Sequence, residues 1–506
     1  MKGTVVRLTL YKLAAALLGL LYSVAQVRLF GATAQVDAFF VATSAVYMIT
    51  SLAQGGQLAE VFLPEYLKLK VEKSPEMAHR LFSAVVNRLL FTVFLLCLAA
   101  FFTAPLLLKI LGPGLAEESR ELATSLFRLS LVLIAFTLFS SFVNTTLNAE
   151  GIFGRAELTG LVNSAISLLL LMAFHAQAGV WILVVALLSG KLVELASGIW
   201  FLRRAGLRFY PVWSVPEYNL ARFFRVLFVT SGYVGATQLY TSIVTAAASF
   251  LPPGTLSVFN YVKLMVSKAS GILIAPITTV FFSKFSNLAA RQKEQLSRSL
   301  ERPIAWILGL TLGITGLIYL SGYEVLAFLW KSKDMPEEML QLAADMLVLG
   351  FVGLIFSGCG SVFRKAAVSL GASSRLYAAW IVTQLVSAAF SYLAIRYASD
   401  AGLMLVLPVN MALMALVSVL VSGRAGIETG MLLREALLVP RFLLLMLLSV
   451  FSLYLIRSYL PGDGLDYRLH AGLKVLAFGF SLMLILPVLY WKEIRRRGLN
   501  PKNYLS

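Results

Sequence analysis

The stretch RLFGATAQVDAFFVATSAVYMITSLAQGGQLAEVFLPEYLKLK, residues 28–70, decides the fold. It predicts a short polar turn over 31–36 and then one long apolar helix that ends in charge at Lys68 and Lys70. Small and polar residues lie in the middle of that helix, where a purely anchoring helix would carry leucine and isoleucine. Hydroxyls and amides need partners inside a bilayer, and small residues let helices pack closely. The helix therefore either lines a cavity or packs tightly against its neighbours.

The rest of the chain is as apolar as this stretch. Of its 506 residues, 59% are hydrophobic and only 13% are charged, whereas soluble domains carry about 25% charged residues. An apolar run of about 20 residues spans a bilayer. The expected class is an all-α polytopic membrane protein with about 14 transmembrane helices. The runs lie near residues 4–30, 37–67, 81–108, 121–148, 155–175, 179–202, 219–250, 255–286, 301–321, 339–368, 375–397, 401–422, 437–459 and 469–491.

An internal repeat is visible at a constant shift of 220 residues. This shift places Ser257 under Asp37 and Phe282 under Phe62, and it aligns two further positions. It maps the first six apolar runs onto the next six, which predicts two similar six-helix halves and two extra C-terminal helices. The predicted domains are residues 1–205, 206–424 and 425–506.

Basic residues predict the orientation of the chain. Most of the 43 lysines and arginines fall in alternate loops and in the tail, which includes KEIRRRG at 492–498. The positive-inside rule then places both termini in the cytoplasm. The net charge of +18 is explained by anionic membrane lipids at the cytoplasmic face. It gives no reason to expect nucleic acid as a partner.

A few charged residues fall inside the apolar runs, where each costs about 2.5–3.5 kcal/mol on insertion scales. Lys191 and Glu194 are three residues apart on one helix and are expected to pair. Lys12, Arg128, Lys263 and Lys268 have no such partner in sequence, and they outnumber the acids near them. This surplus predicts an anionic cargo, although pairing with Glu60 or with helix-end carbonyls is left open for each lysine.

Signatures of enzymes and of bound metals are missing from the sequence. It contains no P-loop, no GxSxG motif and no paired histidine ligands, so neither catalysis nor ATP use is expected. Cys97 and Cys359 lie far apart in apolar runs, which predicts neither a disulfide framework nor a metal site. We expect no cofactor.

Four segments carry a resemblance to a known family. RLFGATAQVDAFFVA (28–42), FLPEYLK (62–68), LNAEGIFGRAEL (147–158) and GTLSVFNYVKLMVSKASGI (254–272) resemble the MurJ/MviN-type lipid II flippases of the multidrug/oligosaccharidyl-lipid/polysaccharide (MOP) exporter superfamily. The resemblance implies two six-helix bundles around a central cavity, with helices 13 and 14 forming a groove for a lipid tail. It also implies a bacterial inner-membrane flippase. The implied cargo is a polyprenyl-diphosphate-linked saccharide, lipid II or a related cell-envelope precursor, moved from the inner to the outer leaflet by alternating access.

The chain departs from the family pattern at charged positions. Tyr22 and Ser23 stand where the family usually carries an Arg-Asp pair, and Leu264 stands where it carries an arginine, one residue after Lys263. The cationic site is therefore expected to be shifted. The resemblance gives the following hypothesis: Lys12, Arg28, Lys263 and Lys268 bind the diphosphate, Thr50, Gln54 and Gln57 contact the saccharide, and Gly55 and Gly56 form a hinge.

Three other functions compete with this interpretation. A cation-coupled multidrug or small-solute antiporter of the same superfamily would need carboxylates inside the membrane, and helices 7, 8, 11 and 12 contain none well inside the bilayer. A membrane polymerase or ligase would need a large outer loop with catalytic residues, and the longest predicted outer loop is 322–338. A scaffold without transport is left open by the sequence.

Overall fold

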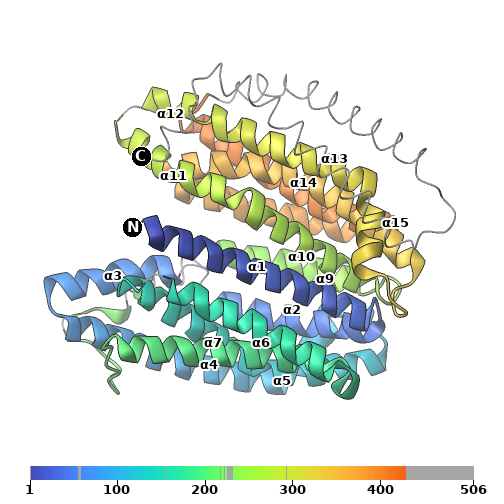
Figure 1. Cartoon of the computed structure of the whole chain (residues 1–506), viewed down its shortest axis with the longest axis horizontal. Helices are drawn as coiled ribbons and strands as arrows, with labels where there is room; N and C mark the ends of the chain where they lie inside the picture. The colour runs from blue at the N-terminus through green and yellow to red at the C-terminus, as the bar shows by residue number, and fades with distance from the viewer. Residues whose placement is uncertain are drawn as a thin grey trace. The chain divides into compact units, whose positions relative to one another are not determined.

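The chain is helical wherever the structure describes regular secondary structure (Figure 1). This computed structural model describes residues 2–54, 58–152, 154–216, 218–221, 223–224, 232–291 and 293–428. The predicted helices 13 and 14, near 437–459 and 469–491, lie outside these residues. The helices are α1 (Lys2–Phe30), α2 (Ala34–Gln54), α3 (Leu58–Glu72), α4 (Pro75–Leu111), α5 (Glu117–Ala149), α6 (Arg155–Ala178), α7 (Trp181–Arg204), α9 (Gly232–Ala248), α10 (Thr255–Leu273), α11 (Ala275–Arg291), α12 (Lys293–Ser299), α13 (Glu301–Trp330), α14 (Glu337–Ser369) and α15 (Ser373–Arg424).

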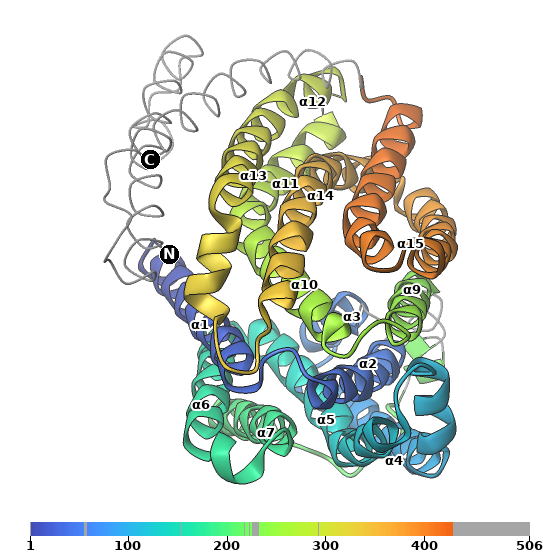
Figure 2. The same cartoon turned by 90° about the vertical axis from the view of Figure 1, so that its right-hand side faces the viewer.

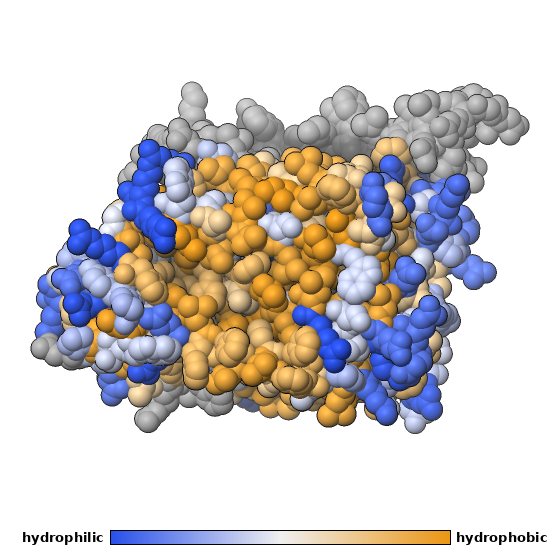
Figure 3. All heavy atoms as spheres, turned by 90° about the horizontal axis from the view of Figure 1, so that it is seen from below, coloured by the Kyte–Doolittle hydropathy of each residue, from blue (hydrophilic) through white to orange (hydrophobic). Residues whose placement is uncertain are grey.

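Many of these helices can cross a membrane. Seven of those described are long and apolar enough, or eight if α10 and α11 count as one span bent by 40°. Figure 3 shows the corresponding surface, a hydrophobic band between hydrophilic side chains gathered at its two ends. The structure therefore supports a polytopic helical membrane protein, whereas the total of fourteen helices stays a prediction.

Helix boundaries follow local sequence signals in several places. α4 begins at Pro75 because the Ser74 hydroxyl accepts a hydrogen bond from the Met77 amide at 3.2 Å, the usual cap for a helix N-terminus. α15 is continuous except for a kink at Ser399, where φ is 48°, within the break predicted between 397 and 401. The predicted outer loop 322–338 is wrong in length, because α13 continues to Trp330. Its apolar residues Val325 to Trp330 extend the helix beyond the length that spans a bilayer.

The described residues form two compact units. The first contains residues 1–268, 332–339 and 377–406, and the second contains residues 269–331 and 340–376 and the described chain from Leu407. The predicted domain boundaries at 205 and 424 remain a prediction.

In the first unit, α5 packs against α2, α4 and α7, and α6 packs against α1 and α7 (Figure 2). An aromatic cluster fixes one end of this unit: the ring of Phe142 lies 4.2 Å from that of Phe62 and 5.1 Å from that of Phe82, between centroids. In the second unit, α14 meets α15 through small residues. A Cβ added at Gly360 would lie 2.6 Å from the Ala415 Cα, the close helix approach that glycine permits in membranes.

Candidate functional site

The first unit contains a cavity of about 470 Å³ surrounded by six helices. Most of its wall consists of hydroxyl, amide and aromatic side chains rather than the aliphatic residues of a packed core. Its lining residues are Gly19, Tyr22, Ser23 and Gln26 of α1, Phe39, Phe40, Thr43, Ser44 and Tyr47 of α2, Asn163, Ser164 and Ser167 of α6, Leu187 of α7, Gln238 and Thr241 of α9, and Asn260, Lys263, Leu264, Ser267 and Lys268 of α10.

The charge in this cavity comes from α10. Lys263 and Lys268 are its only charged lining residues, and no acid is among the described residues around it. The Lys268 ammonium lies against α1 at a position without a side chain, since a Cβ added at Gly19 would be 3.2 Å from Lys268 Nζ. Two ammonium groups in one cavity without a carboxylate favour an anion, because an unpaired buried charge is costly.

Two buried hydrogen-bond donors come from α1. The Tyr22 hydroxyl has no hydrogen-bond partner among the described residues, and the Gln26 side chain, only 4% exposed, lies beside the Tyr261 hydroxyl. A buried donor without a partner costs about 1–3 kcal/mol, so an occupant with acceptor oxygens would remove that cost. The cavity thus combines cations with neutral donors, which matches an anionic and hydroxyl-rich ligand.

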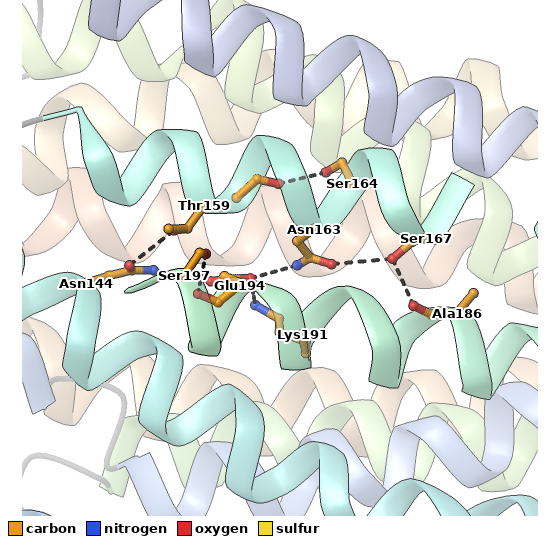
Figure 4. A network of polar contacts seen from close by, with 10 residues as sticks. Asn144, Thr159, Asn163, Ser164, Ser167, Ala186, Lys191, Glu194 and Ser197 are labelled. Carbon is orange, nitrogen blue, oxygen red and sulfur yellow. Dashed lines mark hydrogen bonds and ion pairs between the residues drawn. The ribbon is translucent and has the colours of Figure 1, made fainter. Parts of the chain in front are cut away.

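A polar network behind the cavity fixes the wall that α6 contributes (Figure 4). Glu194 of α7 forms an ion pair with Lys191 at 2.7 Å, which confirms the pairing predicted from their spacing. Its carboxylate also accepts hydrogen bonds from the Asn163 amide at 2.7 Å and from the Asn144 amide at 3.2 Å. Because Glu194 is satisfied in this way, its negative charge is held behind the wall and its role is to orient Asn163.

One end of the first unit is closed by direct contacts between helix ends. The carboxylate of Asp37, at the start of α2, accepts hydrogen bonds from the Gly254 amide at 2.6 Å and the Ser257 amide at 2.7 Å. It accepts a third from the Ser257 hydroxyl. The carboxylate therefore caps α10 and ties it to α2, an arrangement that we call the Asp37 latch.

The backbone is in contact beside this latch. Gly254 has φ of 94°, and a Cβ there would lie 2.4 Å from the Ala32 carbonyl oxygen. Gly31, with φ of 58°, packs against the main chain of Asp334, whose carbonyl accepts a hydrogen bond from the Ala32 amide at 3.0 Å. Only glycine fits these two positions without displacing the neighbouring chain.

The structure brings together some of the predicted site residues and separates others. Lys263 and Lys268 share the cavity, whereas Arg28 is exposed and Thr50 is buried with its hydroxyl donating to the Val46 carbonyl at 2.8 Å. Neither Arg28 nor Thr50 is among the residues that line the cavity. The side chains of Lys12 and Gln54, and residues Gly55, Gly56 and Gln57, lie outside the described residues.

Sequence reasoning missed most of the neutral wall. Asn260 and Ser267 could have been found, because they lie three residues before and four after Lys263 and so share its helix face. Asn163 carried no comparable signal, since its position depends on how α6 packs against α7.

The sequence as a whole matches a known protein family. The profile of the family described as "Lipid II flippase MurJ" matches residues 26–464, which is most of the chain. This chain belongs to the MurJ lipid II flippase family. Relatives named as probable lipid II flippases are found in Thermotoga maritima, 25% identical over 73% of this chain and 74% of the relative, and in Buchnera aphidicola, 23% identical over 64% and 63%. The Buchnera match thus spans less than two thirds of that relative's length.

Solved structures of this family and of its superfamily share the fold. A MurJ lipid II flippase in an inward closed conformation superimposes with a TM-score of 0.79 at 18% identity, covering 96% of this chain and 99% of the other. An inward-facing multidrug transporter of the MATE family follows with 0.65 at 18% identity, covering 82% and 94%. The family profile therefore favours the flippase family over the multidrug antiporter alternative.

Proposed function

We propose that this protein moves a polyprenyl-diphosphate-linked saccharide, lipid II or a close relative, from the inner to the outer leaflet of a bacterial inner membrane. The paired lysines in a cavity without an acidic lining residue carry this proposal. A diphosphate presents negative oxygens to Lys263 and Lys268, and saccharide hydroxyls find partners in the amides and hydroxyls of the same wall. The protein performs no covalent chemistry in this scheme and uses neither ATP nor a cofactor.

Closure of one end of the first unit supports transport by alternating access. The Asp37 latch would hold the cavity shut on the outer side while cargo enters from the cytoplasm, provided that both termini are cytoplasmic. Outward opening then requires the three hydrogen bonds to Asp37 to break. Outward movement of a diphosphate also runs with an inside-negative membrane potential, which contributes about 2.3 kcal/mol per charge per 100 mV.

The proposed head-group contacts follow the cavity rather than the full set predicted from sequence. Lys263 and Lys268 take the diphosphate, while Gln26, Asn163 and Asn260 contact the saccharide. Contributions from Lys12, Gln54 and Gln57, and a hinge at Gly55 and Gly56, remain predictions. The same holds for the two six-helix bundles and for the lipid-tail groove of helices 13 and 14.

Rescue of a bacterial strain depleted of its lipid II flippase tests the proposal. The wild type should restore growth, and the Lys263→Gln/Lys268→Gln variant should not, at equal amounts in the membrane. Lys109→Gln is the matched control, because Lys109 is an exposed lysine at the end of α4 that does not line the cavity. Growth of the double variant at the wild-type rate would overturn the assignment of the two lysines. Failure of the wild type at normal membrane levels would overturn lipid II as cargo.

A further inference from the structure

The first unit has a second cavity, of about 330 Å³. It lies between α4 and α7 where both pack on α5. Its wall is apolar, with Phe82 and Val86 from α4, Phe142 from α5, and Leu195 and Ile199 from α7. No residue of the first cavity contributes to it.

The chain that follows α7 holds this second cavity open. It runs back along α4, where the Tyr210 amide donates to the Ser83 hydroxyl at 3.0 Å and Asn87 donates to the Val212 carbonyl at 2.9 Å. Leu207 and Phe209 of the same segment line the cavity. Because three helices and a hydrogen-bonded strap form its wall, the cavity is a built feature, and an apolar cavity of this kind does not hold water.

Among the described residues that line this cavity, Arg203 is the only charged one, and it lies in the last turn of α7. Most arginines near it are engaged: Arg80 pairs with Glu76, Arg88 donates to the Trp213 carbonyl, and the guanidinium of Arg204 lies 5.1 Å from the centroid of the Trp200 ring. For Arg203, by contrast, neither a hydrogen bond nor an ion pair is found within the part of the chain that the structure describes. Arg203 is exposed in the last turn of α7, where a cation complements the helix dipole, so its guanidinium is accessible to a lipid headgroup.

We propose that this cavity binds one acyl chain of an anionic phospholipid, whose phosphate pairs with Arg203. An apolar cavity with a guanidinium at its edge matches an amphiphile of this kind, and arginine is suited to phosphate because its fork donates two parallel hydrogen bonds. Phe209 and Trp213 lie half-exposed in the strap, as aromatic residues do at the level of lipid headgroups. This lipid would occupy the protein whether or not cargo is present, and the site does not depend on the proposed function.

Native mass spectrometry of the full-length protein, with phosphatidylglycerol or phosphatidylcholine added, tests the proposal. The wild type should retain phosphatidylglycerol in preference to phosphatidylcholine. Arg203→Gln should weaken the retention of phosphatidylglycerol about fivefold, the usual worth of one basic residue at an anionic membrane surface. Arg204→Gln should leave the retention of phosphatidylglycerol unchanged. It removes the same charge at the next residue, whose side chain does not line the cavity.

A third variant separates the acyl site from surface electrostatics. Ile199→Trp fills the cavity from its half-exposed side and should reduce retention of both lipids. Equal retention of the two lipids by the wild type would overturn the proposal, as would equal effects of Arg203→Gln and Arg204→Gln. Undiminished retention by Ile199→Trp would show that the lipid lies elsewhere on the surface and would overturn the cavity as its site.

Discussion

Removal of the Asp37 carboxylate should shift the conformational equilibrium toward an outward-open state. In the described structure this carboxylate accepts hydrogen bonds from the Gly254 amide, the Ser257 amide and the Ser257 hydroxyl. A hydrogen bond to a charged group contributes about 1.5–3 kcal/mol. Asp37→Ala loses all three, but water can satisfy the freed donors once the helix ends separate. We therefore expect a net shift of about 3 kcal/mol, or about 150-fold in the ratio of closed to open protein.

Distances between two spin labels, measured by electron paramagnetic resonance, would report this shift. Gln35 and Pro253 are both exposed, and they lie next to the latch on the two sides that it joins. With Cys97 and Cys359 replaced by alanine, labels at Gln35→Cys and Pro253→Cys should give one short distance in proteoliposomes. Asp37→Ala should add a longer distance as a major population.

The matched control is Asp334→Asn, at the same end of the unit. Asp334 is exposed, and its contact with Ala32 is made by its main-chain carbonyl, so loss of its side-chain charge should leave the distances unchanged. A single short distance in Asp37→Ala, equal to that of the parent protein, would refute the latch. A longer distance of equal population in Asp334→Asn would show that surface charge, and not the latch, controls this end.

Three further predictions concern stability. Glu194→Ala should lower the free energy of unfolding by about 3–5 kcal/mol, because it leaves Lys191 unpaired, and the midpoint of thermal unfolding should fall with it. The Lys191→Met/Glu194→Met double variant should recover most of the loss. No recovery would exclude the unpaired charge as the cause. Burial would raise the pKa of Glu150, but hydrogen bonds from Lys70 and Tyr66 outweigh it, and the pKa is lowered from 4.5. The wild type should therefore be more stable than Glu150→Gln above pH 4.5, and this difference should disappear as the pH falls below that value. A difference in the unfolding midpoint that does not depend on pH would contradict this. Gly360→Val should destabilise the contact between α14 and α15 in the same assay, because its Cβ has no space against the Ala415 Cα. Gly271→Val, at an exposed position of α10 where a Cβ meets nothing within 4 Å, should have little effect.

Much of the fold could be predicted because apolar run length alone determines where helices cross a bilayer. The break near Ser399 and the Lys191–Glu194 pair are local in sequence, and both were found. The end of α13 differs from the prediction because the apolar run 301–321 already suffices to span a bilayer, whereas the helix continues beyond it to Trp330. The single charge of Glu324 does not interrupt α13, because the residues that follow it are apolar.

The candidate site was predictable only in its charges. Lysines inside apolar runs are visible in sequence, so Lys263 and Lys268 could be named before their cavity was known. The partners of Glu194 and the donors at Tyr22 and Gln26 depend on which helices are neighbours. Asp37 is an intermediate case. The shift of 220 residues aligns it with Ser257 as an equivalent position in the repeat, but an alignment of this kind does not predict that the two residues are hydrogen-bonded.

The glycine contacts beside the latch bear on how such a protein can exist in an energised membrane. A carrier with a large polar interior risks leaking protons and small ions, and each such leak would dissipate the potential that drives outward movement of its cargo. At Gly31 and Gly254 the barrier is main chain against main chain. Rotation of one side chain is therefore not enough to breach it, and entire helix ends have to move apart. The seal at this end of the first unit would thus depend on two residues that contribute by having no side chain.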